Sequence, residues 1–371
     1  MRSALRKPAF WLGLLLPLVL FAFMWRFAAQ RPRLVATLPA TAASLAVSND
    51  EQQIAAATSD GKMSLWSARE GRLNDLPLER GVLASTNNAG LGTPTLAFSP
   101  DGKTLLAAGV APRGANSTAL YAWTIATPSS LAWSLATDYK DDFATFVPAR
   151  DARRAVQLSS DVVKVFDVSA PGTPRPRKNS ALARDFPVLV RVVPDLRDKT
   201  PAAVALSPDG QSLPAAVALS ADGQNLIVVE PNEALRFYSV ATGTQTGQTP
   251  APAFFSGAPS PSLVMISPSP DGRFVALCDN TGVRVWNIAA KTWTQSASGS
   301  STMRFVAWAP DGGTFWAGGD SVQQWRAPDL KPLRELPVGG PLALSKDGRT
   351  LYTRSLPSPG NAPGVLAWRV G

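Results

Sequence analysis

The chain has 371 residues, of which 45% are hydrophobic and 17% are charged, a balance that excludes a chain disordered throughout. Its 28 glycines and 33 prolines favour many short strands joined by tight turns over a helical protein. The single cysteine excludes an intrachain disulfide, and the lack of histidine excludes Ser-His-Asp triads, histidine general bases and histidine metal ligands.

The net charge of +9 is concentrated at the amino terminus. Residues 1–33 contain six basic and no acidic side chains, which leaves 30 basic and 27 acidic ones for the remaining 338 residues. A nucleic-acid-binding protein carries its basic surface on the folded domain. The charge distribution therefore predicts no nucleic-acid partner.

Residues 8–25 form an uncharged, strongly apolar run of 18 residues. A membrane-spanning helix needs about 20 such residues, with about 17 as the lower limit, whereas the apolar region of a cleaved signal is shorter. A cleavage site after Ala29 would also require a small residue where Phe27 stands. An uncleaved signal anchor is therefore favoured over a cleaved signal. The predicted segments are a basic tail over 1–7, a transmembrane signal-anchor helix over 8–28, a short linker over 29–33 and one folded domain over 34–371.

The orientation of this helix depends on its flanking charges. Basic residues lie on both sides, so the positive-inside rule gives nearly a tie. A short basic tail ahead of a first apolar helix usually stays in the cytoplasm, which places the domain on the other side. The Ala-, Arg- and Pro-rich composition suggests a bacterium with a GC-rich genome. We therefore expect a single-pass protein of the bacterial inner membrane with a periplasmic C-terminal domain; the inverted, cytoplasm-facing topology is the alternative.

A turn of the Ser-Pro-Asp-Gly type recurs seven times, with an apolar strand on each side. The Asp-Gly pair suits a tight hairpin that needs positive φ, and this explains the aspartates better than metal binding does. The turn aspartates are Asp50, Asp101, Asp151, Asp222, Asp271, Asp311 and Asp347. A third strand then ends near an aromatic residue, and these aromatics are Trp66, Trp123, Phe166, Phe237, Trp286, Trp325 and Trp368. Five of the seven Asp-to-aromatic separations agree within two residues, and the two longer ones contain loop insertions.

A fourth strand follows each aromatic, as in 130–136, 186–193 and 292–297. Seven units of four strands predict an all-β fold, a seven-bladed β-propeller with roughly 48 residues per blade. The chain ends on a third strand over 364–370, and the segment 33–39 is expected to supply the missing outer strand of that blade. This pairing would close the ring and remove an exposed sheet edge.

These units resemble the WD40-like repeats and the related bacterial (YVTN-type) repeats with the Ser-Pro-Asp-Gly turn. Without histidine, the Gly-His dipeptide of WD40 repeats and its hydrogen-bonded tetrad cannot form, and an aspartate follows the aromatic only at Asp167. The chain is therefore identified as a divergent member, whose blades are stabilised by packing and turns rather than by that hydrogen-bonded network. The resemblance implies that the strand before each Asp-Gly turn lies innermost, and on these strands only Arg304 is charged.

One repeat is duplicated. The segment 201–213 is followed directly by 214–226, with eleven of thirteen positions identical. Only the second copy leads into an aromatic at the usual distance, but either copy could supply the inner strand, so the local register is open.

Two insertions contain the candidate partner-binding residues. Arg175, Arg177 and Lys178 lie in a basic insertion that could meet an acidic partner or anionic lipid headgroups, or be a solvated proline-rich loop. Phe254 and Phe255 lie in a proline-rich segment and could anchor a partner, or pack on their own blade.

No P-loop, nucleophile elbow, paired-cysteine or EF-hand spacing is present, so no catalytic, cofactor-binding or metal-binding residue is predicted. We expect a binding or scaffold protein rather than an enzyme, with a membrane or envelope protein as its partner. The alternative is a propeller enzyme of the lactonase or quinoprotein kind, with a site built from loops on one face.

Overall fold

The computed structural model describes residues 32–38, 42–58, 62–67, 72–76, 95–110, 118–126, 129–136, 145–149, 152–158, 163–169, 173–174, 184–185, 188–192, 217–220, 222–229, 235–250, 263–279, 282–295, 303–355 and 364–371. Within these ranges no helix is long and apolar enough to cross a membrane. The predicted transmembrane segment over 8–28 lies outside the described residues.

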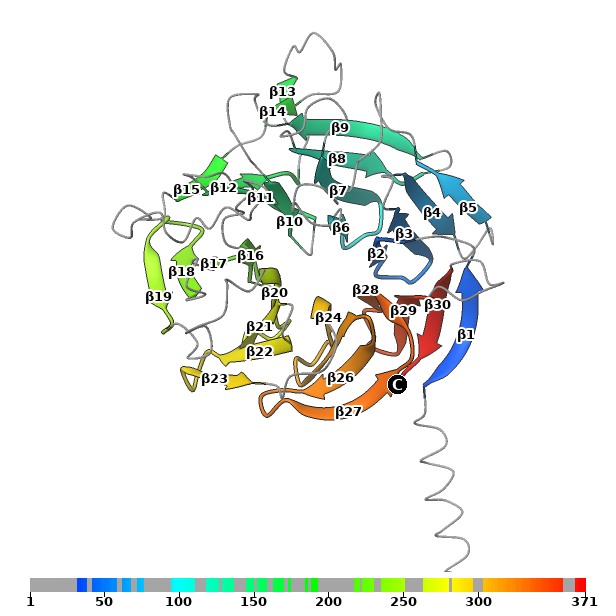
Figure 1. Ribbon diagram of the computed structural model, residues 1–371. Coiled ribbons are helices and arrows are strands. Elements are labelled where there is room, and N and C mark those ends of the chain that lie inside the picture. Colours follow the sequence, from blue (N-terminus) through cyan, green and yellow to red (C-terminus); the bar gives the residue numbers. More distant parts are fainter. Residues whose placement is uncertain are drawn as a thin grey trace, which may run out of the picture.

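Seven antiparallel four-stranded sheets are arranged as blades around a central axis, which confirms the predicted propeller (Figure 1). Blades 1 and 2 contain β2 (Ser44–Val47), β3 (Gln53–Ala57), β4 (Met63–Ser67) and β5 (Arg72–Asp75), then β6 (Thr95–Phe98), β7 (Thr104–Val110), β8 (Thr118–Thr124) and β9 (Ser130–Ala136). Blades 3 and 4 contain β10 (Thr145–Pro148), β11 (Arg154–Leu158), β12 (Val163–Asp167) and β15 (Val188–Val192), then β16 (Val217–Leu219), β17 (Asn225–Val229), β18 (Leu235–Ser239) and β19 (Gln245–Gln248). Blades 5 and 6 contain β20 (Leu263–Pro268), β21 (Phe274–Asp279), β22 (Gly282–Asn287) and β23 (Thr292–Gln295), then β24 (Met303–Trp308), β25 (Thr314–Gly319), β26 (Val322–Arg326) and β27 (Lys331–Leu336).

Blade 7 combines the two ends of the described chain. It contains β28 (Gly339–Leu344), β29 (Thr350–Arg354), β30 (Val365–Arg369) and, as its outer strand, β1 (Arg33–Leu38). The pairing of β1 with β30 is the closure that the sequence predicts, with Leu38 opposite Val365. A separate two-stranded sheet, β13 (Thr173–Pro174) with β14 (Arg184–Asp185), interrupts blade 3 between β12 and β15.

Six of the seven predicted third-strand aromatics face the preceding blade, and Phe237 of blade 4 does not. Seven hydrophobic clusters fill the seven junctions between neighbouring blades, and each contains an aromatic from the third strand of the following blade. In blade 4 the aromatic facing the preceding blade is Tyr238, which pairs with Leu226. The predicted Phe237 packs instead toward blade 5, because consecutive residues of a strand point to opposite faces of the sheet.

Antiparallel pairing sends the connections alternately to the two faces of the ring. The seven turns between first and second strands share one face, which we call the Asp-Gly face. They begin at Ser48, Ser99, Ala149, Ser220, Ser269, Ala309 and Ser345. Since Arg33 pairs with Arg369, and Arg369 with Thr350 just after the last of these turns, β1 also begins at the Asp-Gly face.

The duplicated repeat is resolved in favour of its second copy. β16 and the start of β17 both come from 214–226, and they pair as the inner two strands of blade 4. The first copy, over 201–213, lies outside the described residues.

Candidate interaction surfaces

A repeated hydrogen-bond network builds the turns of the Asp-Gly face. In five turns the serine hydroxyl donates to the aspartate Oδ1 at 2.5–2.6 Å. The same hydroxyl accepts the amide N–H five residues after the serine, at 2.9–3.0 Å. The carboxylate also accepts the amide N–H two residues beyond the aspartate, at 2.8–3.1 Å. These turns therefore satisfy their own polar groups, and the turn aspartates act structurally, as predicted.

The network also favours the ionised form of three of the aspartates. The serine hydroxyl is the first cause that lowers the pKa of Asp101, Asp222 and Asp347, since it donates to the ionised carboxylate. The role of the serine was not predicted. Its sequence signal is a serine two residues before the aspartate in five of the seven turns.

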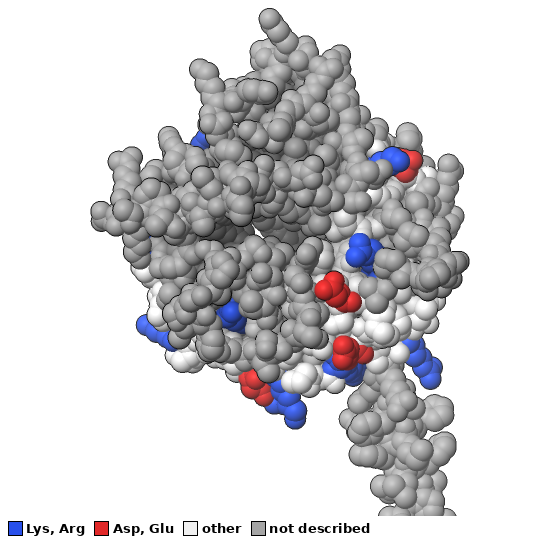
Figure 2. Space-filling model, viewed as in Figure 1, with Lys and Arg blue, Asp and Glu red and all other residues white. Residues whose placement is uncertain are grey.

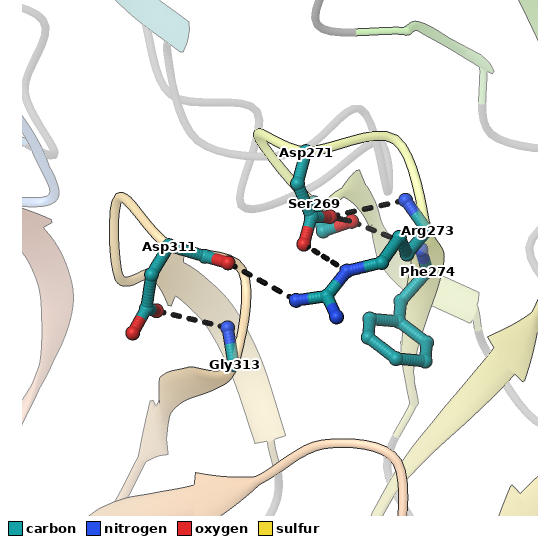
Figure 3. Close-up of polar contacts among 6 residues, drawn as sticks. All are labelled: Ser269, Asp271, Arg273, Phe274, Asp311 and Gly313. Atoms are coloured by element: carbon teal, nitrogen blue, oxygen red, sulfur yellow. Dashed lines mark hydrogen bonds and ion pairs between the residues drawn. The ribbon is translucent and has the colours of Figure 1, made fainter.

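Contacts between adjacent turns join the blades on this face. The Asn49 amide donates to the carbonyl of Pro100 at 2.7 Å, and Arg154 donates to the carbonyl of Gly223. Figure 3 shows the third contact: Arg273 forms an ion pair with Asp271 and donates from Nη2 to the carbonyl of Asp311 at 3.2 Å. These contacts link the turns of blades 1 and 2, of blades 3 and 4, and of blades 5 and 6.

The positive φ of these turns allows a matched test of two glycines. Gly272 (φ 71°) and Gly348 (φ 73°) have nearly the same backbone conformation. A Cβ on Gly272 would meet nothing within 4 Å, whereas one on Gly348 would lie 2.8 Å from Pro310 Cδ in the neighbouring blade. Gly272→Ala should cost about 1 kcal/mol through backbone strain, and Gly348→Ala at least about 1 kcal/mol more. Equal losses in chemical denaturation would show that this junction is looser than described.

Two carboxyl groups meet where blade 7 joins blade 1. Glu51 has φ 57° at the position that glycine occupies in five other turns. Burial, followed by the charge of Asp347, raises the pKa of Glu51, while Ser345 and Arg369 oppose the rise. Burial and then the charges of Glu51 and Asp347 raise the pKa of Tyr352 to about 12. Protonation of Glu51 is therefore more favourable in the folded ring than in the unfolded chain.

The raised pKa fixes the sign of a pH effect. The favourable contribution of protonated Glu51 is complete below its ordinary value of 4.5 and is lost as the pH rises through its folded-state pKa. Glu51→Gln should therefore stabilise the protein at pH 7, by less than about 1 kcal/mol because the pair is largely solvated. The gain should vanish below the ordinary pKa.

Asp101→Asn provides the control of opposite sign. The lowered pKa of Asp101 means that its contribution is present above the ordinary value of 3.8 and is lost as the pH falls through the folded-state value. This variant should destabilise the protein at pH 7. Thermal midpoints of both variants measured across pH 4 to 7.5 test the pair, and a loss of stability in Glu51→Gln at pH 7 would contradict it.

The inner strands offer few polar groups. Across the seven described inner strands Arg304, on β24, is the one charged residue. No group of three or more Asp, Glu or Cys side chains that could hold a metal is found in the part of the chain that the structure describes. The described charges visible in Figure 2 are of both signs and are scattered rather than gathered into a patch.

The five predicted partner-binding residues lie outside the described residues. Arg175, Arg177 and Lys178 fall between β13 and β14, and Phe254 and Phe255 between β19 and β20. The strands that flank the two sets leave from different faces. The chain departs from β12 and re-enters β15 on the Asp-Gly face, whereas it departs from β19 on the opposite face. The two insertions therefore start from opposite sides of the ring.

Exposed apolar side chains lie on the outer rim, and sequence reasoning missed them. Leu34 and Val35 on β1 are the most exposed of these, at 50% and 59%. Val188, Leu189 and Leu333 lie on other outer strands, and Ile288 lies in the turn between β22 and β23. The outer strand of a blade is covered by neighbouring elements on one of its faces or on neither. The apolar pattern of its sequence therefore does not show which of its side chains are exposed.

The amino-acid sequence matches no protein-family model and no curated protein. The chain therefore resembles WD40-like repeats in its fold alone. The shared features are seven four-stranded blades, each with one Asp-Gly turn or its substitute.

Proposed function

We propose that this protein is a membrane-anchored interaction module that presents the face opposite the Asp-Gly turns to a protein partner. The observation that carries the proposal is the direction of β1, which begins at the Asp-Gly face. The apolar segment 8–25 lies just ahead of β1 in the sequence. An anchor in this segment holds the Asp-Gly face toward the membrane and leaves the opposite face free.

The lengths of the connections between strands support a membrane-facing Asp-Gly face and a partner-binding opposite face. All seven turns between first and second strands contain five residues, and five of them close on their own serine and aspartate. On the opposite face, the connections between β5 and β6, β15 and β16, and β19 and β20 contain 19, 24 and 14 residues, whereas the Asp-Gly face has one connection of comparable length, the 20 residues between β12 and β15. Long loops on a rigid scaffold are where binding surfaces usually form.

The expected partner is another membrane or envelope protein, and the expected location is the bacterial inner membrane with the domain in the periplasm. A propeller presents broad faces on a rigid ring and so suits a scaffold. The excess of basic residues near the amino terminus lies in the segments that flank the apolar run. Basic residues on both sides of this run fit a position beside the membrane.

The test is mild crosslinking in intact membranes, followed by detergent extraction and affinity purification of the full chain. We expect the protein to resist alkaline carbonate extraction and to recover a reproducible protein partner. Reporter fusions at the C-terminus decide the orientation. Release by carbonate would contradict the anchor, and purification without any reproducible partner would contradict the interaction role.

A further inference from the structure

The outer strand of blade 7 is exposed on both of its faces. Five of the six residues of β1 are exposed, and only Leu38 is buried, in the cluster between blades 7 and 1. Val35 occupies a bulge between the pairs Leu34–Trp368 and Ala36–Ala367. Closing the ring therefore uses Leu38 and the backbone of β1, and it leaves at least half of Leu34 and of Val35 exposed.

Basic side chains gather where β1 begins. Arg33 pairs in register with Arg369, and the carbonyl of Arg349 accepts the amide N–H of Val370, the next residue after Arg369. Two acidic groups face them: the charge of Arg369 acts on Glu51, and Arg349 Nε lies 3.9 Å from Asp347 Oδ2. This end of the strand thus combines three guanidinium groups and two carboxyl groups with the two most exposed apolar side chains.

The chain between the apolar segment and β1 is short. Seven residues, 26–32, separate residue 25 from Arg33. Fully extended, they span at most about 25 Å. The headgroup layer is itself about 5–8 Å thick, so an anchor in residues 8–25 keeps the start of β1 beside the lipid surface.

We propose that β1 rests on the membrane, with Arg33, Arg349 and Arg369 binding anionic lipid headgroups and Leu34 and Val35 entering the interface. Arginine beside apolar side chains is the combination that binds at anionic interfaces. This inference rests on the proposed membrane anchor. It identifies the edge of the Asp-Gly face, at the start of β1, as the part of the ring nearest the lipid.

The test uses the full chain in vesicles of equal parts phosphatidylethanolamine and phosphatidylglycerol. A single cysteine is introduced as Val35→Cys and labelled with an environment-sensitive fluorophore, and a lipid-borne quencher reports contact. The native Cys278 is fully buried, and labelling of the unsubstituted protein measures its background. Leu189→Cys is the matched control, because Leu189 is 41% exposed and lies at the equivalent outer-strand bulge of blade 3.

We expect the label at position 35 to be quenched several-fold more than the label at position 189. Quenching should fall in phosphatidylcholine vesicles and in the background Arg33→Gln with Arg369→Gln. Equal quenching at the two positions, or no dependence on anionic lipid, overturns the contact while leaving the anchor in place. Release of the protein from the vesicles by alkaline carbonate overturns the anchor and the inference together.

Discussion

Replacing Trp308 with alanine is expected to lower the free energy of unfolding by about 4 kcal/mol. Trp308, on β24, is 2% exposed. Its ring stacks on Phe274 of blade 5 at a centroid distance of 6.2 Å and tilts against Phe315 of blade 6 at 4.8 Å. Removing it leaves a cavity between two blades that neither blade can fill alone.

Trp308→Phe separates packing from hydrogen bonding. The indole Nε1 donates to the carbonyl of Ser267 on β20 at 3.0 Å, and phenylalanine keeps a ring but loses this donor. Its cost should be about 1–2 kcal/mol, between wild type and Trp308→Ala. Denaturant titration in detergent measures both variants. A loss below about 1 kcal/mol for Trp308→Ala would show that the junction of blades 5 and 6 is not a packed core.

Leu38→Ala should weaken the closure of the ring by about 3 kcal/mol. Leu38 is 6% exposed and packs with residues of blades 7 and 1, including Val365 and Ile54. The lost contacts lie at the junction where the two ends of the described chain meet. Loosening β1 would also expose the edge of β30, which favours association with other chains.

Val35→Ala on the same strand is the control. Val35 is exposed, so its truncation should change stability by less than about 0.5 kcal/mol. Denaturant titration and light scattering during heating compare the two variants. Equal stability of the two would mean that β1 is not needed for closure.

The fold could be predicted because its signals are periodic. Each Asp-Gly turn or its substitute marks a hairpin, and each aromatic marks a third strand, so errors in one repeat are corrected by the others. Blade 4 is the exception. Two aromatics, Phe237 and Tyr238, are adjacent in its third strand. Their separations from the turn aspartate differ by one residue, so the spacing alone does not select one of them. Packing against blade 3 selects Tyr238.

The candidate surfaces could not be predicted in the same way. Leu34 and Val35 have the pattern of an ordinary apolar strand, and only the geometry of blade 7 shows that at least half of each stays exposed. The Glu51–Asp347 junction joins the first and last turns of the ring, and nothing in the local sequence of either turn indicates the other. The basic and aromatic insertions carry no periodic signal and remain predictions.

The face assigned to the partner can be tested most directly by photocrosslinking in intact cells. A photoreactive residue is placed at exposed positions on the face opposite the Asp-Gly turns, at Asp75, Thr95 or Asp320, and on the Asp-Gly face, at Lys103, Gln224 or Lys346. We predict crosslinks to one protein partner from the first set and none from the second. The same partner captured from the Asp-Gly face and not from the opposite face would contradict the proposed orientation and binding surface.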